Sequence, residues 1–337
     1  MECEKSPLEI RLPRLLSDRS VMGASIAYVL GDSIQVAAAG VRDKETAEPV
    51  NVRTVFNAAS LTKPVVSYAV LQLVDASVLD LDEPLSSTVP PIVPDDTMST
   101  LITLRHVLAH TCGLQNLRDK NPLRMHFRPG ARFSYSSVGF SLLQSAVEAR
   151  TGEGLEATLR RLVFEPLGMN SSSLEWQSQF LNNMASPHEA QERLEMHRPS
   201  AASASWSLQT TASDYGAFVA AVLRGDRLKA STWEKWLSAT VMVPKGAVVH
   251  LDGEPSATEA DVGWGLGWGI EPSQRTFFQW GKMPGVRAFV MGSLARQAGV
   301  VLLTNSNKGL RLMDDLTRDV LPGEHAAIRW LADNVGE

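Results

Sequence analysis

Ser60-Leu61-Thr62-Lys63 is the first pattern in this chain that can carry out covalent chemistry. A serine and a lysine three residues apart lie on one face of a helix, with their Cβ atoms about 5–6 Å apart. At a helix start, unpaired N–H groups favour negative charge on a serine oxygen or on an oxyanion. The lysine accepts the serine proton only if burial or neighbouring positive charge lowers its pKa toward neutrality. The pattern is short, so it needs support from other motifs.

Tyr135 is the second candidate, in Tyr135-Ser136-Ser137, which follows the turn signal Pro129-Gly130 and precedes an expected helix. A phenol with a lowered pKa can relay a proton to a leaving group. The alternative interpretation is an ordinary aromatic anchor.

The third candidate is the run Gln279-Trp280-Gly281-Lys282 within an aromatic strand pattern. Glycine in a strand lets a ligand approach the backbone closely. The alternative interpretation is a sheet strand followed by a turn.

Strand patterns lie at both ends of the chain and helical patterns lie in the middle. We expect strands at 24–29, 35–39, 277–280, 286–291 and 300–304, and a Gly/Trp-alternating strand at 263–269. We expect helices at 61–78, 103–108, 137–150, 155–164, 213–224, 232–237, 310–320 and 324–334. The pattern predicts an α/β (α+β) fold, in which an antiparallel sheet flanked by terminal helices carries an inserted, mainly helical subdomain. In a single catalytic domain spanning 1–337, the sheet part would cover about 1–57 and 200–337, and the helical part about 58–199.

Together the three motifs resemble the serine β-lactamase and penicillin-binding-protein family, in particular class C β-lactamases, the esterases built on that fold and D-alanyl peptidases. Segments with no role in catalysis also match in order. The resemblance extends over about residues 20–335, and these further segments are 79–84, 102–114, 164–169, 215–223, 265–269 and 301–305.

The resemblance implies a role for each matching residue. Ser60 would be the nucleophile that forms an acyl-enzyme, and Lys63 and Tyr135 would move its proton. The backbone N–H groups of Ser60 and Lys282 would form the oxyanion hole, where losing one donor costs about 100- to 1000-fold in rate. Ser137 stands where the family usually has Asn, which puts recognition of a substrate amide in doubt.

The third motif departs most from the family, whose members carry Lys-Thr-Gly or His-x-Gly there. One register aligns Gln279-Trp280-Gly281 with that motif, and the other aligns Trp280-Gly281-Lys282 with the Trp-Gly-Gly variant of the esterases. In either register the cation that would bind a β-lactam carboxylate is absent or moved, and Lys282 and Arg287 are the candidates to replace it. The departure favours esters as substrates over β-lactams.

We therefore predict a serine hydrolase that acts on a small carboxylic ester with a short or medium acyl chain. The alternatives are hydrolysis of a β-lactam or a D-amino-acid amide, acyl transfer to an alcohol or amine, and a catalytically silent binding protein on the same fold. Phe127, Trp206 and Met283 are expected to shape an apolar acyl pocket.

Composition excludes several other classes of protein. The chain has 337 residues, with 32 Lys and Arg against 37 Asp and Glu. Its mild acidity argues against nucleic acid as a partner, and its apolar runs are too short to span a membrane. Two cysteines and the absence of a secretory pattern in residues 1–5 predict a cytoplasmic protein. His106 and His110 have helical spacing but no third ligand, so we expect neither metal nor cofactor.

Overall fold

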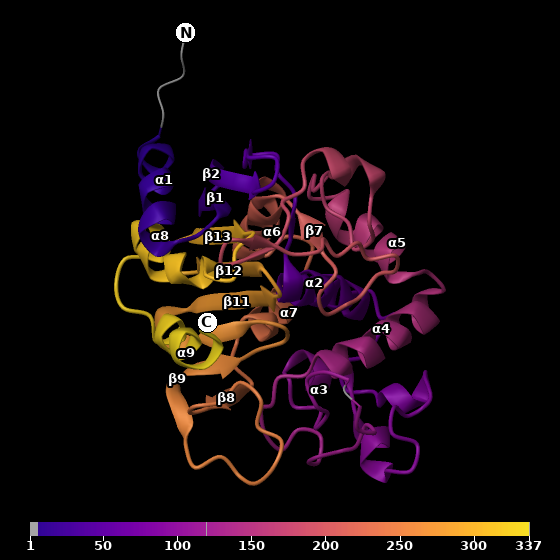
Figure 1. The fold of residues 1–337 in the computed structure, drawn as a ribbon. Coiled ribbons are helices and arrows are strands. Elements are labelled where there is room, and N and C mark those ends of the chain that lie inside the picture. Colours follow the sequence, from indigo (N-terminus) through magenta and orange to yellow (C-terminus); the bar gives the residue numbers. More distant parts are fainter. Residues whose placement is uncertain (1–5, 119, 337) are drawn as a thin grey trace.

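The computed structural model describes residues 6–118 and 120–336 (Figure 1). Residues 1–5, including Cys3, lie outside the described part, so the secretory pattern is not addressed. The centre of the fold is an antiparallel sheet built from strands near both ends of the chain. In spatial order its nine strands are β3 (Glu48–Pro49), β2 (Ser33–Asp43), β1 (Gly23–Leu30), β13 (Ala298–Thr304), β12 (Val286–Ser293), β11 (Thr276–Met283), β10 (Gly269–Glu271), β9 (Thr258–Trp264) and β8 (Val241–Pro244).

The pairing of β1 with β13 joins the two ends of the chain. Ala24 lies opposite Thr304, and Leu30 lies opposite Ala298. Seven of the eight residues of β1 are buried, which means that both faces of the sheet are covered. The predicted antiparallel sheet with terminal helices is therefore confirmed.

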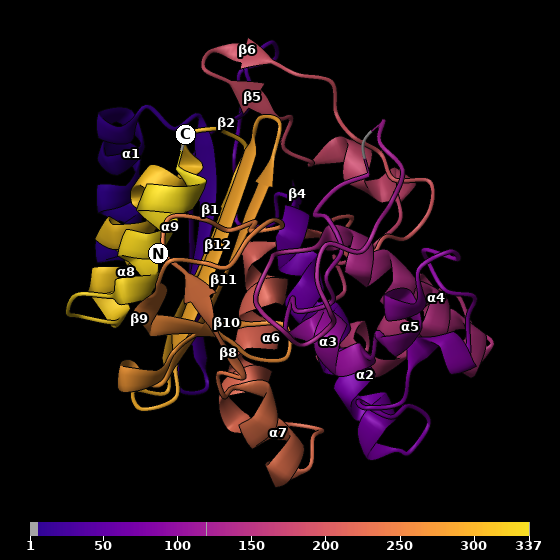
Figure 2. The same cartoon turned by 90° about the horizontal axis from the view of Figure 1, so that it is seen from below.

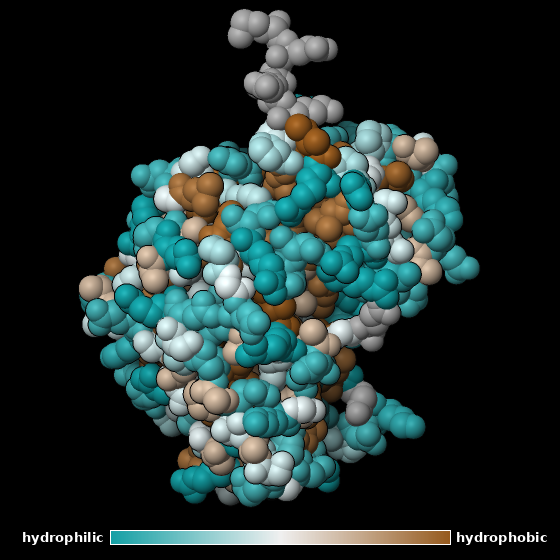
Figure 3. Space-filling model, turned by 90° about the vertical axis from the view of Figure 1, so that its left-hand side faces the viewer, coloured by the Kyte–Doolittle hydropathy of each residue, from teal (hydrophilic) through white to brown (hydrophobic). Residues whose placement is uncertain are grey.

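Helices form a layer on each face of this sheet (Figure 2). One layer consists of α1 (Pro7–Arg19), α8 (Met313–Val320) and α9 (Ala326–Val335), and its outer surface is mainly hydrophilic with smaller apolar areas (Figure 3). The opposite face carries α6 (Ala212–Arg224) and the helical part of the chain. The remaining α-helices are α2 (Thr62–Asp75), α3 (Leu104–Leu108), α4 (Ser137–Thr151), α5 (Leu155–Leu159) and α7 (Ala230–Trp236).

Short elements complete the chain. Two small two-stranded sheets pair β4 (Phe56–Asn57) with β7 (Gln209–Thr210), and β5 (His188–Glu189) with β6 (Glu192–Arg193). A π-helical turn, η4 (Arg160–Phe164), follows α5. The 3₁₀ turns are η1 (Ala59–Leu61), η2 (Leu85–Ser87), η3 (Thr97–Leu101), η5 (Ser178–Asn182), η6 (Pro272–Gln274) and η7 (Gly309–Leu312). No helix of the described residues combines the length and apolar character needed to cross a bilayer.

Two features of the fold differ from the sequence-based expectation. The helix α1 was not predicted, although Ser6 and Glu9 form a reciprocal capping box at its start. The expected strand at 263–269 is wrong, because β9 ends at Trp264 and the chain turns before β10. Gly267 has φ +110° in this turn, and a Cβ atom there would lie 2.0 Å from Ser67 Oγ.

A buried pair fastens α9 to the sheet. His325 Nδ1 lies 2.8 Å from Glu271 Oε2, and its Nε2 lies 3.1 Å from the Leu321 carbonyl oxygen. Both ring nitrogens therefore face acceptors, which suits the doubly protonated cation. Burial alone would lower the pKa of His325, but the hydrogen bonds and charge of Glu271 outweigh burial and raise it.

We predict that this pair makes folding stability depend on pH. Because the folded-state pKa of His325 is raised, its stabilisation is complete below the ordinary value of 6.5 and is lost as the pH rises through the folded value. The fall in melting temperature between pH 5.5 and 8.5 should be about 1–2 °C smaller in His325→Gln than in wild type, for an effect on the order of 1 kcal/mol in a chain of this length. Calorimetry of both proteins at the two pH values measures this, and an equal loss in both would contradict it.

Candidate active site

Ser60 and Lys63 lie in hydrogen-bonding contact at the start of α2. Ser60 belongs to η1, and Lys63 belongs to the first turn of the helix. Lys63 Nζ lies 3.1 Å from Ser60 Oγ. Lys63 is fully buried, whereas Ser60 is partly exposed. A substrate can therefore reach the serine oxygen while the amine behind it stays out of water.

The backbone before Ser60 is held in an unfavourable conformation. Ala59 has φ +47°, in the left-handed region that non-glycine residues rarely adopt. Its N–H donates to Asn57 Oδ1 at 2.7 Å, and its carbonyl oxygen accepts from Thr62 Oγ1 at 2.7 Å. The Leu208 N–H in turn donates to Thr62 Oγ1 at 3.0 Å, which links the turn to the residue that precedes β7. These bonds stabilise the conformation that presents Ser60.

Lys63 has no carboxylate partner among the described residues. Its Nζ donates to the Ser205 carbonyl oxygen at 2.9 Å and lies 4.9 Å and 5.4 Å from the ring centres of Tyr135 and Phe140. Burial lowers the pKa of Lys63 to about 7. A substantial fraction of the amine is therefore neutral near pH 7 and able to accept a proton from Ser60.

Tyr135 is fixed between the helical part and the sheet. Its backbone N–H donates to the Val248 carbonyl oxygen at 3.0 Å, and its ring centre lies 4.0 Å from that of His110 and 5.1 Å from that of Trp280. Burial raises the pKa of Tyr135, although hydrogen bonds to Ser60 and Gln279 oppose this. The structure therefore does not give Tyr135 the lowered pKa that was considered for a proton relay. The phenol keeps its proton and is suited to donate it.

Gln279 is the residue of the third motif that faces Ser60. Its Nε2 lies 3.3 Å from the Ser60 carbonyl oxygen and 3.3 Å from Tyr135 Oη. Gly281 points the same way, and a Cβ atom there would lie 2.5 Å from the Ala58 carbonyl oxygen. The geometry matches the register Gln279-Trp280-Gly281, with a neutral amide where the family's cation stands.

The side chain of Lys282 is turned away from Ser60. Its Nζ donates to the carbonyl oxygens of Val335 and Gly336, each at 3.0 Å, near the end of α9. Arg287, opposite Lys282 on β12, donates through Nη1 to the carbonyl oxygens of Met283 and Val286. The side chains of Lys282 and Arg287 are thus both held by backbone carbonyl oxygens. The expectation that one of them replaces the carboxylate-binding cation of the family is wrong.

The backbone of Lys282 nevertheless runs beside the Ser60 turn. β10 pairs with β11 only at Thr276–Phe278, so the remainder of β11 packs along η1 through Gly281. The backbone N–H groups of Ser60 and Lys282 thus come from two neighbouring segments. Their function as an oxyanion hole stays a prediction.

The remaining predicted residues lie at the border of the site. Ser137 begins α4, and its N–H donates to Asn116 Oδ1 at 3.1 Å. The Trp280 side chain is buried, with its ring centre 5.8 Å from that of Trp264 and 5.7 Å from that of Trp330. Trp280 therefore supports Tyr135 from behind. A substrate contact of Ser137 or Trp280 stays a prediction.

Three supporting groups were not identified from the sequence as parts of this site. The Ser205 carbonyl is a backbone atom far from Lys63 in the chain, so no residue pattern indicates it. Asn57 was missed, although an Asn two residues before a tight turn is a known turn former. His110 was considered only as a metal ligand, yet its Nδ1 accepts from the Ser136 N–H at 3.1 Å and its ring packs on Tyr135.

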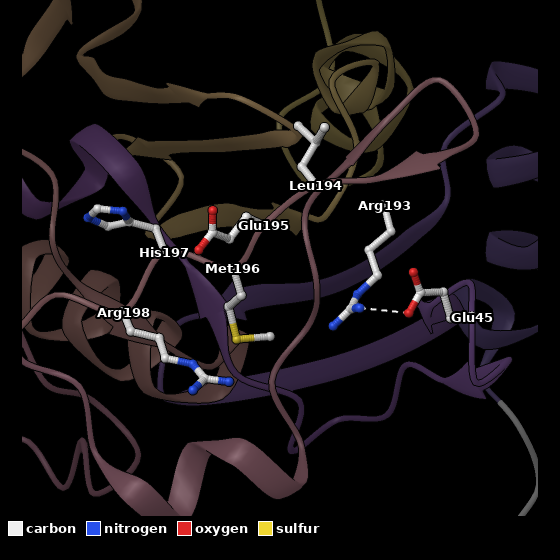
Figure 4. A pocket seen from close by; sticks show the side chains of 7 residues that line it. All are labelled: Glu45, Arg193, Leu194, Glu195, Met196, His197 and Arg198. Carbon is white, nitrogen blue, oxygen red and sulfur yellow. Dashed lines mark hydrogen bonds and ion pairs between the residues drawn. The ribbon is translucent and has the colours of Figure 1, made fainter.

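Residues between 193 and 198 line two hollows. The larger has a volume of about 700 Å³ and is lined by Glu45 and 193–198, with Arg193 paired to Glu45 (Figure 4). The smaller has a volume of about 150 Å³ and is lined in part by Met283. Phe127 is not among its lining residues and instead packs under the Arg132 guanidinium, so a role of Phe127 in an acyl pocket stays a prediction.

The family model described as Beta-lactamase matches residues 11–322. The chain belongs to the β-lactamase family. Named relatives in this family include an esterase and penicillin-binding proteins, so the chain is a member of a superfamily of serine hydrolases.

Individual relatives support the same family. The chain is 31% identical to esterase EstB of Burkholderia gladioli over 194 residues, which cover 48% of this chain and 49% of the esterase. The match therefore spans about half the length of that relative. The chain is 26% identical to penicillin-binding protein 4 of Amycolatopsis lactamdurans, and the match covers 95% of this chain and 90% of that relative.

Solved structures show the same fold. A penicillin-binding protein homologue from Pyrococcus abyssi superimposes with a TM-score of 0.75 at 20% identity, covering 94% of this chain and 78% of the homologue. A class C β-lactamase superimposes with a TM-score of 0.73 at 17% identity, covering 94% and 96%. At this identity the likeness concerns the fold alone.

We predict that the reactivity of Ser60 follows the protonation of Lys63. Below pH 7 the labelling rate with a fluorophosphonate should fall about tenfold per pH unit, because the protonated amine cannot accept the serine proton. Lys63→Arg should lower the rate at pH 8 at least about 100-fold, since a guanidinium stays protonated. Intact-mass spectrometry over time measures labelling.

The matched control is Lys229→Arg, because the Lys229 amine donates to the Asp75 carbonyl oxygen at the surface. This variant should label at the wild-type rate. A labelling rate in wild type that is independent of pH from 5 to 8 would contradict the role of Lys63.

Proposed function

We propose that the protein is a carboxylesterase that hydrolyses a small neutral ester through an acyl-enzyme on Ser60. The observation that carries the proposal is the neutral amide of Gln279 beside Ser60 and Tyr135, with Lys282 and Arg287 bound elsewhere. A β-lactam or a C-terminal D-amino acid carries a carboxylate. Gln279, Lys282 and Arg287 provide no positive charge at the site to bind that carboxylate. A neutral ester needs none.

In acylation, Ser60 Oγ attacks the ester carbonyl carbon as its proton passes to neutral Lys63. The backbone N–H groups of Ser60 and Lys282 stabilise the negative charge that develops on the carbonyl oxygen. The bond to the alcohol oxygen then breaks, and the leaving alkoxide takes the proton of Tyr135. The Lys63 proton returns through the hydrogen-bonded network to Tyr135, so the acyl-enzyme forms with the site neutral again.

In deacylation, water attacks the acyl carbonyl carbon and its proton passes to the Tyr135–Lys63 pair. The bond between the acyl carbon and Ser60 Oγ breaks, and Ser60 Oγ regains a proton from that pair. The carboxylic acid leaves and ionises in solution. Tyr135 is protonated at the start of each step, because burial raises its pKa and Gln279 cannot supply a positive charge to lower it.

Amide hydrolysis is the second candidate, supported by similarity to a penicillin-binding protein along 95% of this chain. Acyl transfer and a silent binding role are the further alternatives. A cytoplasmic location also stays a prediction from the sequence.

The direct test compares hydrolysis of p-nitrophenyl butanoate by wild type and by Ser60→Ala. We expect turnover by wild type and a loss of at least about 1000-fold in the variant, because no other nucleophile stands at this position. Turnover that survives in Ser60→Ala would exclude Ser60 as the nucleophile. A labelled but hydrolytically inactive wild type would favour amides or acyl acceptors instead.

We also predict that the charge at position 279 shifts the pH dependence of kcat/KM. Gln279→Lys should move the acidic limb of kcat/KM for a neutral ester about one unit lower, because a neighbouring cation lowers the pKa of Lys63. Gln279→Glu should move the limb in the opposite direction. The pH–rate profiles of wild type and the two variants are measured at fixed ionic strength. A shift of the acidic limb in the same direction in both variants would contradict the electrostatic role of position 279.

A further inference from the structure

The Ser205 carbonyl oxygen is the partner that orients the Lys63 amine. It accepts from Lys63 Nζ at 2.9 Å, and Ser60 Oγ lies 3.1 Å from the same nitrogen. A neutral amine has two N–H groups and one lone pair, and a carbonyl oxygen only accepts. With one N–H bound to Ser205, the lone pair is free to face the Ser60 hydroxyl. The position of this carbonyl therefore affects how well Lys63 accepts the Ser60 proton.

Ser205 lies in a turn outside the helices and strands of the fold. The Ser207 hydroxyl closes this turn, because it accepts from the Ser203 N–H at 2.8 Å and donates to the Ser203 carbonyl oxygen at 3.2 Å. These bonds are internal, so they fix the shape of the turn but not its distance from Lys63. That distance depends on contacts between the turn and other elements.

Gln144 of α4 makes such a contact with both ends of its amide. Its Oε1 accepts from the Ala204 N–H at 3.0 Å, and its Nε2 donates to the Ala202 carbonyl oxygen at 3.0 Å. The same Nε2 donates to Glu148 Oε1 at 3.0 Å. Because a carboxylate only accepts, Glu148 fixes which way the amide points. The amide thus binds the backbone directly before Ser205 through a donor and an acceptor.

This contact connects the supports of the two groups that move protons. α4 begins at Ser137, two residues after Tyr135, whereas Lys63 belongs to α2. Gln144 lies about two turns along α4 from Ser137. It therefore links the turn that holds Lys63 to the helix that follows Tyr135.

We propose that Gln144 is a positioning residue, which holds the backbone at 202–204 so that the Ser205 carbonyl oxygen directs the Lys63 lone pair at Ser60. Gln144 acts on the reaction only through Ser205 and Lys63. The inference rests on the proposed role of Lys63 as the base that activates Ser60.

The first test compares Gln144→Met with wild type. Methionine keeps the length and the helix-forming tendency of glutamine but has no amide. The rate at which a fluorophosphonate labels Ser60 is measured by intact-mass spectrometry from pH 5 to 9. On the plateau above pH 8 the variant should label at least about tenfold more slowly, because a small misplacement of a catalytic group has a large effect on rate.

The pH profile separates lost positioning from a general loosening of the site. The ammonium form of Lys63 gains more from the Ser205 carbonyl than the neutral amine does, so losing this acceptor lowers the pKa of Lys63 further below about 7. The acidic limb of Gln144→Met should therefore move about half a pH unit lower. Water that entered a loosened site would hydrate the ammonium ion and move the limb higher. A limb that moves higher, or a plateau equal to that of wild type, would overturn the proposal.

Gln72→Met is the matched control, because Gln72 also joins a helix to backbone elsewhere. It lies near the end of α2, the helix of Lys63, and its Nε2 donates to the Leu162 carbonyl oxygen at 3.2 Å while its Oε1 accepts from Arg227 Nε at 3.3 Å. Thermal denaturation should show a loss of stability in this variant as well. Its labelling plateau and acidic limb should stay at the wild-type values. The same changes in Gln72→Met as in Gln144→Met would overturn the specific role of Gln144.

Gln144→Glu is a second variant, which tests the proposal even if Gln144→Met does not fold. The carboxylate keeps the side-chain length and the acceptor for the Ala204 N–H, but it loses both donors and faces Glu148. Its plateau rate should be about threefold below that of wild type, because the bond to the Ala202 carbonyl oxygen is lost. A plateau equal to that of wild type would count against the proposal.

The outcomes separate this inference from the proposed function. If wild-type labelling falls below pH 7 but both Gln144 variants label as wild type does, the role of Gln144 is overturned while the role of Lys63 stands. If wild type is not labelled at all, Ser60 is not an activated nucleophile, and the proposed function and this inference fail together.

Discussion

Burial of Lys63 without a countercharge is the constraint on which the rest of this site depends. An ammonium ion in such a position loses its hydration and gains the Ser60 hydroxyl, the Ser205 carbonyl and two aromatic faces in return. The pKa therefore falls to about 7 from desolvation alone. A carboxylate placed beside the amine would hold it protonated and remove the base. In the proposed mechanism, the apolar contact between the helical part and the sheet therefore activates Ser60.

The same low polarity gives Tyr135 the opposite function. Desolvation disfavours the charged form of any group, so it lowers the pKa of an amine and raises that of a phenol. In the proposed reaction, Lys63 is therefore the base and Tyr135 is the acid, although the two groups share one environment. A cation at position 279 would act on both groups. The neutral Gln279 leaves their difference intact and provides no partner for an anionic substrate.

The C-terminal helix supports this arrangement from the other side of the sheet. Trp330 of α9 packs on Trp280, which packs on Tyr135. Lys282 binds the carbonyl oxygens at the end of the same helix, and His325 fastens its start to Glu271. The start of α9 is therefore held to β10, and its end is held to β11, the strand that carries Gln279. Geometry at the site is linked to packing more than 50 residues away in the chain.

The sequence by itself determined the architecture and indicated the candidate groups of the proposed reaction. Strand and helix periodicities gave the antiparallel sheet with terminal helices, because hydrophobic spacing reflects burial directly. Ser60, Lys63 and Tyr135 stood out because the order and spacing of their motifs resemble those of the serine β-lactamase and penicillin-binding-protein family. Only the tertiary structure decided their ionisation, since the Ser205 carbonyl and the surrounding rings come from distant segments. It also decided which way Lys282 points and which turn the Gln144 amide binds, because strand facing and side-chain contacts depend on packing that no local pattern records.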